Sequence, residues 1–84
     1  VFATARYTTT GSLDGSFGTG GVVTTAIQNG AYSQSVLVQP NGLILTAGSS
    51  LGNFATQFAL ARYTTSGAFD TTFGNNGIVL TTIN

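Results

Sequence analysis

Apolar positions along the chain come in short runs and show no sustained helical period. The runs are rich in Val, Ile, Phe, Tyr and Thr, and Gly or Asn residues interrupt them. Short runs of this composition, bounded by turn-forming residues, are typical of β-strands. The pattern therefore predicts an all-β chain with six strands, at residues 2–8, 21–28, 33–39, 43–49, 57–64 and 77–83.

The clearest local signal is a tight turn between the third and fourth predicted strands. Two aliphatic runs flank the sequence Pro40-Asn41-Gly42. Pro40 fixes φ at a value that suits the first central position of a turn, and Asn41 and Gly42 tolerate positive φ. We therefore expect a β-hairpin, with structural roles for Pro40 and Gly42.

The chain also repeats itself at a distance of 56 residues. Residues 2–28 align with residues 58–84 without a gap, and 15 of the 27 positions are identical. A repeat of about this length is typical of solenoids, propellers and arrays, in which neighbouring units bury each other's faces. Most of the distinctive residues should therefore serve the architecture.

The repeat suggests how the chain is organised. Residues 31–84 are expected to form one complete four-stranded antiparallel unit, and residues 1–30 the third and fourth strands of a preceding unit. Only one copy of the first two strands exists, and residues 58–84 should pair with it. The strand at Phe2–Tyr7 is then left with an unpaired edge, which is a template for another chain.

Several motifs together carry a family resemblance. They are Ser35-Val-x-Val-Gln-Pro-Asn-Gly42, Ala47-Gly48, Phe58-Ala-Leu-Ala-Arg-Tyr63, Gly67-x-x-Asp70-x-x-Phe-Gly74 and Gly77-Ile-Val. This pattern resembles the delta-60 repeat, a bacterial and mostly extracellular β-propeller repeat family of unknown biochemical function. Asn41 stands where the family's pattern has Asp, and Thr65-Ser66 where it has Asp or an Asn-Asp pair. The resemblance implies a propeller-type fold and provides no catalytic residues.

The expected fold class is thus an all-β, antiparallel, propeller-type repeat of about one and a half four-stranded blades. A chain of this size buries only about 60–65% of its unfolded surface. We therefore expect oligomerisation to complete it, as a closed assembly, a stack or a filament. Since the chain begins within a repeat, a fragment of a longer secreted propeller is the other expectation.

Charged side chains are scarce, at 5% of the residues, against about 25% in an average domain. The only cations on side chains are Arg6 and Arg62, and the net charge is zero. This argues against binding to nucleic acid or to anionic membranes, which requires clustered Lys or Arg. Short apolar runs argue against a membrane-spanning helix. The surface rich in Thr, Ser, Gly and Asn favours an extracellular or cell-surface location.

Six residue types are absent: Cys, His, Lys, Glu, Met and Trp. Without Cys or His the usual zinc and redox-metal sites are excluded. Ser and Thr are abundant, but the chain has no His or Lys to activate one of them as a nucleophile. We therefore expect neither an enzyme nor a cofactor.

The four charged residues form two repeat-equivalent pairs, Arg6 with Asp14 and Arg62 with Asp70. The aspartates could be an acid/base pair of a glycosidase or calcium ligands, or each Arg–Asp pair could anchor a loop. Hydrolysis needs two carboxylates at one site, whereas repeat-equivalent residues lie one unit apart. Calcium takes six to eight oxygens, and each unit supplies one carboxylate. The structural interpretation is favoured.

The aromatic residues divide into two groups. Phe2 with Phe58, Tyr7 with Tyr63 and Phe17 with Phe73 are repeat-equivalent, which favours packing within or between units. Tyr32 and Phe54 lie outside the doubled region. With Gln34 and Asn53 they form a candidate ligand surface for a glycan, and packing between units is the alternative.

Three functions remain open at this point. The chain is a non-catalytic extracellular scaffold or binding module, a structural subunit of a homo-oligomer or filament, or part of a longer propeller with its active residues elsewhere. The expected partners are copies of the chain itself, with a glycan or a surface protein as further candidates.

Overall fold

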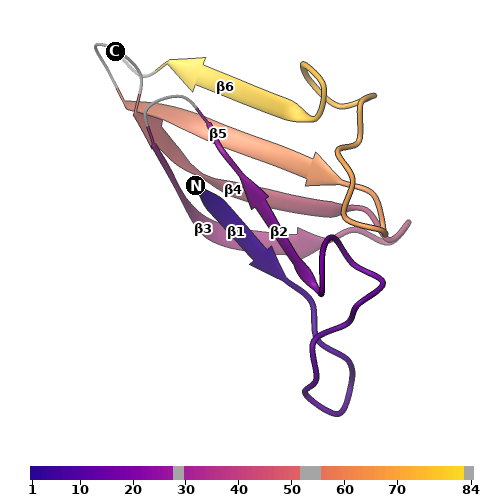
Figure 1. Ribbon diagram of the computed structural model, residues 1–84. Coiled ribbons are helices and arrows are strands. Elements are labelled where there is room, and N and C mark those ends of the chain that lie inside the picture. Colours follow the sequence, from indigo (N-terminus) through magenta and orange to yellow (C-terminus); the bar gives the residue numbers. More distant parts are fainter. Residues whose placement is uncertain (28–29, 52–55, 83–84) are drawn as a thin grey trace.

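The computed structural model describes residues 1–27, 30–51 and 56–82 of the 84-residue chain. These residues form six strands, drawn in Figure 1: β1 (Phe2–Ala5), β2 (Val22–Thr25), β3 (Ala31–Val38), β4 (Ile44–Leu51), β5 (Thr56–Tyr63) and β6 (Ile78–Thr82). Among the described residues no helix is long and apolar enough to cross a membrane. The prediction of an all-β chain with six strands is confirmed.

The strands form two antiparallel sheets. One contains β1 and β2, and the other has the order β3-β4-β5-β6. In Figure 1 the β1–β2 hairpin lies in front of the four-stranded sheet as a second layer. The division into a half-blade at residues 1–30 and a full propeller blade at residues 31–84 remains a prediction.

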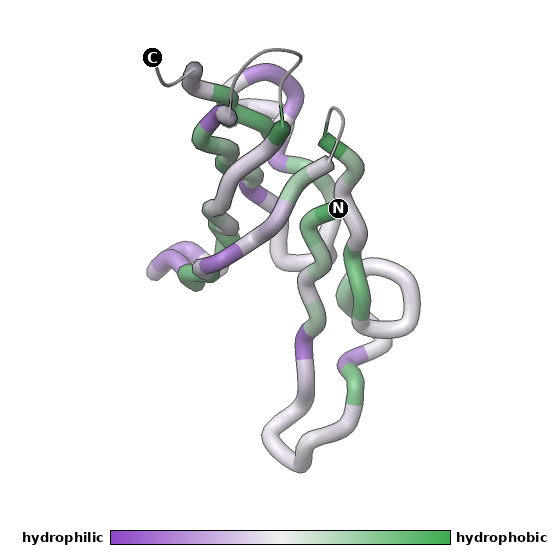
Figure 2. Tube along the Cα trace, turned by 90° about the vertical axis from the view of Figure 1, so that its left-hand side faces the viewer, coloured by the Kyte–Doolittle hydropathy of each residue, from purple (hydrophilic) through white to green (hydrophobic). Residues whose placement is uncertain are grey.

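The first strand is shorter than predicted. It ends at Ala5, and Tyr7 makes only an isolated bridge with Leu13. Among the described strands, β1 pairs only with β2, as far as Ala5↔Val22, whereas the equivalent strand β5 also pairs with β4 as far as Tyr63. The Arg6 N–H donates to the Gly21 carbonyl (2.9 Å), and the Arg6 carbonyl accepts the N–H of Asp14 (2.8 Å). These bonds turn the chain into a long loop, which projects beyond both sheets in Figures 1 and 2.

The predicted hairpin between β3 and β4 is confirmed. The Gly42 N–H donates to the Gln39 carbonyl (2.8 Å), and the Gln39 N–H donates to the Leu43 carbonyl (2.8 Å). Gly42 has φ of 87°, the left-handed region that glycine adopts without steric cost. Asn41 does not adopt positive φ; its side-chain oxygen instead accepts the N–H of Leu43 (3.1 Å).

A β-bulge interrupts the pairing of β3 with β4. The register shifts between Ser33 and Ser35, so Gln34 has no partner on β4. Gly48 lies opposite this irregularity, and a Cβ atom there would be 2.0 Å from the Tyr32 carbonyl oxygen. The bulge therefore requires a residue without a side chain at position 48.

Buried side chains from both layers form one hydrophobic core. Its members are Phe2, Phe17, Ile27, Ala31, Ile44, Ala59, Ala61 and Tyr63. Only one face of each sheet contributes to this core, because strand residues alternate between faces. The opposite face of each layer is left open, and this asymmetry determines where a functional surface can lie.

Candidate functional site

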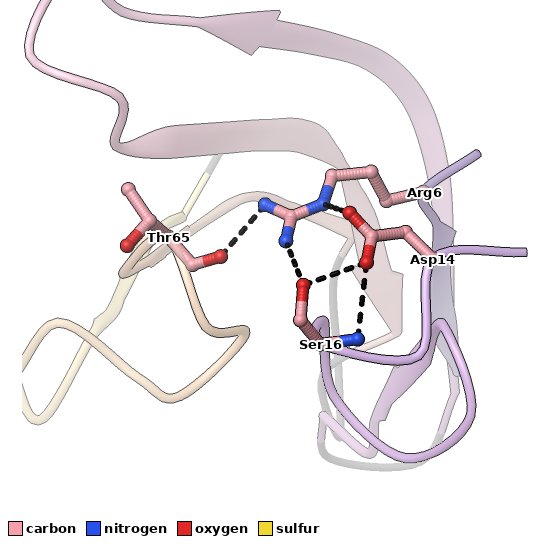
Figure 3. Close-up of polar contacts among 4 residues, drawn as sticks. All are labelled: Arg6, Asp14, Ser16 and Thr65. Atoms are coloured by element: carbon pink, nitrogen blue, oxygen red, sulfur yellow. Dashed lines mark hydrogen bonds and ion pairs between the residues drawn. The ribbon is translucent and has the colours of Figure 1, made fainter. Parts of the chain in front are cut away.

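Arg6 and Asp14 form a network that links two distant loops (Figure 3). Arg6 Nε donates to Asp14 Oδ2 (3.0 Å), and Arg6 Nη2 donates to Ser16 Oγ (3.1 Å). Arg6 Nη1 donates to the carbonyl oxygen of Thr65 (2.7 Å), in the loop after β5. The guanidinium also lies over the Phe17 ring, 4.7 Å from its centroid. Arg6 thus anchors its own loop and connects it to the second copy of the repeat.

Arg62 and Asp70 repeat the local part of this network. Arg62 Nε donates to Asp70 Oδ2 (2.9 Å), and the guanidinium lies 4.5 Å from the centroid of Phe73. Asp70 Oδ1 accepts the N–H (3.1 Å) and the hydroxyl (2.6 Å) of Thr72. Within the described part of the chain, no counterpart of the bond from Arg6 to a distant loop is found at Arg62.

The two copies of the repeat bury opposite faces. Phe2 is completely buried, whereas its equivalent Phe58 is 59% exposed. For the tyrosines the order is reversed, because Tyr63 is completely buried and Tyr7 is 60% exposed. Within the described residues one member of each of these two pairs packs in the core and the other is exposed. The expectation that the aromatic pairs pack within or between units therefore stays a prediction for Phe58 and Tyr7.

Two names describe these faces. The phenylalanine face carries Phe2, Phe17 and Thr25 in the first copy, and Phe58, Phe73 and Thr81 in the second. The tyrosine face carries Ala59, Ala61 and Tyr63 in the second copy, and Ala3, Ala5 and Tyr7 in the first. Inside the chain, the phenylalanine face of the first copy packs on the tyrosine face of the second.

Three of the hydrogen bonds between described residues of the two copies join the repeat-equivalent regions of this internal interface. The first joins Arg6 Nη1 to the Thr65 carbonyl, and the second joins the Gly18 N–H to the Ser66 carbonyl (2.8 Å). The third joins the buried hydroxyls of Thr25 and Tyr63. Sequence analysis missed Gly18, Thr25 and the loop carbonyls as contact groups, although the identity of Gly18 with Gly74 and of Thr25 with Thr81 was a signal.

Residues 39–73 match the family model described as "Domain of unknown function (DUF5122) beta-propeller". This part of the chain is therefore similar to a β-propeller repeat family of unknown function. The match confirms the resemblance found in the sequence motifs. No curated protein and no solved structure was found to match the chain.

The matched part of the propeller repeat runs from the hairpin turn through β4 and β5 to Phe73. It therefore contains Pro40, Gly42, Arg62 and Asp70, the residues to which the sequence assigns structural roles. The match adds no catalytic or ligand-binding residue to them, since the family has no known function.

The pKa of each aspartate is lowered, which favours its ionised form. The pKa of Asp14 is lowered chiefly by the Ser16 hydroxyl, then by the Ser16 N–H and by Arg6. The pKa of Asp70 is lowered in the same way by Thr72 and Arg62. A general acid needs a raised pKa instead, so this arrangement suits loop anchoring better than acid catalysis.

We expect the chain to lose stability when acid protonates Asp14 and Asp70. Because both pKa values are lower in the folded state than the ordinary 3.8, their stabilisation is present above that pH. It is lost as the pH falls through the lower, folded-state values. The urea midpoint, followed by circular dichroism between about pH 6 and pH 2, measures this loss.

The double variant Asp14→Asn and Asp70→Asn is the control for this measurement. It removes both side-chain carboxyls of the chain, so its urea midpoint should be lower at neutral pH and nearly independent of pH. If this variant lost as much stability in acid as the wild type, Asp14 and Asp70 would not be the groups responsible for that loss.

The candidate ligand surface is described only in part. Tyr32 is 65% exposed on β3, and Gln34 is exposed at the bulge. Asn53 and Phe54 lie outside the described residues. Gln34 instead lines a shallow groove of about 270 Å³ together with Phe58, a residue that the sequence assigned to packing. The groove is lined by Gln34, Ser35, Ala47, Gly48, Ser49 and Phe58.

Proposed function

We propose that the chain is a non-catalytic structural and binding module that assembles with copies of itself. The product is a larger β-propeller-like ring or a filament. The observation that carries this proposal is the opposite burial of equivalent residues, Phe2 against Phe58 and Tyr63 against Tyr7. The first copy exposes the face that the second copy buries, and the second copy exposes the face that the first copy buries. We therefore expect units of this fold to stack on one another.

The edge strand β3 supports the same proposal. Its side chains Val36, Leu37 and Val38 are 62%, 58% and 66% exposed, and the strand carries no charge. Exposed edge strands are usually guarded by charged residues or proline, since they otherwise pair with other chains. An unguarded apolar edge fits a protein that associates.

The non-catalytic part of the proposal rests on the side chains available. The two aspartates are engaged by Arg, Ser or Thr in the two loop networks. Hydroxyl groups are plentiful, but the chain has no His, Lys or Cys to act as base or nucleophile. We propose no cofactor and no metal ion for the same reason.

The proposed location is outside a bacterial cell or on its surface. It is supported by the low content of charge and by the resemblance to a mostly extracellular repeat family. A glycan or a surface protein is proposed as a further partner at Tyr32 and Gln34, both exposed on β3. Aromatic rings beside amide side chains suit such ligands because they combine apolar and hydrogen-bonding contacts.

Light scattering across about a hundredfold range of concentration tests the assembly. We expect a mass above 8.5 kDa that rises with concentration. A discrete multiple would indicate a closed assembly, and growth without limit a filament. A monodisperse species of 8.5 kDa at every concentration would contradict the proposal.

A second proposal is that the chain is part of a longer secreted propeller. It is favoured by the match of residues 39–73 to a β-propeller family, and by the two-stranded sheet beside a four-stranded one. Binding or catalytic residues would then lie in other blades. A reading frame that encodes further copies of the repeat on either side of residues 1–84 would support this proposal, and a frame that encodes no further copy would contradict it.

A further inference from the structure

The internal interface joins two different faces, so it leaves one of each kind unused. The phenylalanine face of the first copy and the tyrosine face of the second are in contact. The phenylalanine face of the second copy and the tyrosine face of the first have no layer against them in the described chain. These two open faces have the same residue types as the pair that is already in contact.

The open phenylalanine face retains unused polar groups. Phe58 is 59% exposed and Thr81 is exposed. Among the described residues, no hydrogen bond is found for Arg62 Nη1, the Gly74 N–H or the Thr81 hydroxyl. Their equivalents Arg6, Gly18 and Thr25 all make bonds across the internal interface.

The open tyrosine face has the matching acceptors. Tyr7 is 60% exposed, and no hydrogen bond is found within the described chain for its hydroxyl or for the carbonyls of Thr9 and Thr10. These groups are equivalent to the Tyr63 hydroxyl and to the carbonyls of Thr65 and Ser66. They lie where the chain leaves β1 and on the loop that projects beyond both sheets (Figures 1 and 2).

The two copies also differ in the space around an equivalent glycine. A Cβ atom on Gly67 would lie 2.6 Å from the nitrogen of Gly18, because the two loops touch there. A Cβ atom on Gly11 would meet nothing within 4 Å. The backbone is the same in both, with φ of 90° and 89°. The loop at Gly11 therefore already has the shape that the internal contact uses.

We propose that the open phenylalanine face of one chain binds the open tyrosine face of a second copy, and that the contact repeats the internal interface. Arg62 Nη1 then donates to the carbonyl of the partner's Thr9, and the Gly74 N–H to the carbonyl of the partner's Thr10. Thr81 pairs with the partner's Tyr7. This inference rests on the proposed self-assembly and names the surfaces that perform it.

Such a contact is head-to-tail, because each chain contributes a different surface. A heterologous contact continues from chain to chain until the rotation closes a ring, or else forms a filament. The internal interface also includes Ala31 of β3 and Ile44 of β4, strands that have no counterpart in the sheet of β1 and β2. Association should therefore be concentration-dependent, with the internal interface as the stronger of the two.

Two variants test the direction of the contact. Phe58→Arg places a charge on the open phenylalanine face, and Tyr7→Arg places one on the open tyrosine face. Each alone should weaken self-association at least about tenfold, since docking would bury an unpaired guanidinium. Both positions are about 60% exposed, so the urea midpoint of the monomer should not change.

The decisive experiment mixes the two variants. Phe58→Arg retains an intact tyrosine face, and Tyr7→Arg retains an intact phenylalanine face. The equimolar mixture should form a 1:1 dimer in light scattering, while each variant alone stays monomeric. A mixture in which both variants keep the mass of a monomer would overturn the head-to-tail contact.

The matched control is Val38→Arg on the edge strand β3, which is 66% exposed and lies outside both faces. It should weaken self-association much less than Phe58→Arg or Tyr7→Arg does. If Val38→Arg abolishes assembly and the other two variants do not, the proposed assembly stands but the inferred interface is overturned. If the wild-type chain never associates, both proposals fail.

An independent measurement does not depend on any variant being folded. In wild-type chain, the Gly74 amide should shift in its NMR spectrum and become protected from hydrogen exchange as the concentration rises. The Gly18 amide, already bonded to Ser66 (2.8 Å), should stay unchanged. A Gly74 amide that remains unprotected in the associated state would overturn the proposed contact.

Discussion

Replacement of Gly48 with alanine is expected to disrupt the four-stranded sheet. The added Cβ would lie 2.0 Å from the Tyr32 carbonyl oxygen and 2.8 Å from the Cα atom of Ser33. Both are backbone atoms of β3, so no side-chain rotation can relieve the overlap. We expect a loss of about 3 kcal/mol or more in the free energy of unfolding.

Urea unfolding followed by circular dichroism measures this loss, and Gly15→Ala is the matched control. A Cβ atom at Gly15 would meet nothing within 4 Å, and its φ lies outside the left-handed region. That variant should stay within about 0.5 kcal/mol of wild type. Equal urea midpoints for the two variants would contradict the bulge geometry at Gly48.

Truncation of Phe2 is expected to destabilise the chain far more than truncation of its repeat equivalent Phe58. Phe2→Ala removes a completely buried ring from the core, which costs about 3–5 kcal/mol. A domain of this size has about 4–13 kcal/mol in total, so the variant should be unfolded in part of its population. Phe58 is 59% exposed, and its truncation should cost less than about 1 kcal/mol.

The comparison is internally controlled, because the two phenylalanines lie in nearly identical sequences. Urea unfolding should be measured at dilutions where the chain is monomeric, so that association through Phe58 does not contribute to its stability. Equal losses for the two variants would show that the internal interface does not have the arrangement described here.

These experiments separate the internal interface from the contact between chains. Gly48 and Phe2 act within the folded chain, whereas Phe58 and Tyr7 act on the open faces. If the proposed contact forms, one member of each repeated pair serves stability and the other serves association, which would account for the large apolar side chains on the surface of this nearly uncharged chain.

Local sequence was sufficient for the number and approximate positions of the strands and for the hairpin, but not for the ends of the first two strands. Alternation along Thr56–Tyr63 places Ala59, Ala61 and Tyr63 on one side, and this pattern is visible without a structure. Pro40, with its fixed φ, and Gly42, which tolerates positive φ, likewise predict the turn. The loop networks at Asp14 and Asp70 were anticipated as pairs, because identical spacing recurs in both copies of the repeat.

Other features were not visible in the sequence. The bulge at Gln34 arises from the register between β3 and β4. Gly48 leaves room for the bulge, but a glycine at this position does not by itself predict one. The contact of Arg6 with Thr65 spans the two copies, and no local pattern distinguishes Arg6 from Arg62. Asn41 is a residue type that tolerates positive φ, but its φ in the structure is not positive.

The sequence by itself determined the all-β class of the fold, the approximate positions of the strands, the internal repeat and the similarity of residues 39–73 to a β-propeller repeat family. Those properties follow from local periodicity, turn chemistry and spacing, which each copy carries in full. Only the tertiary structure decided which copy buries its phenylalanine and which its tyrosine. Burial depends on the layer that packs against a face, and near-identical sequences with different neighbours are therefore buried differently.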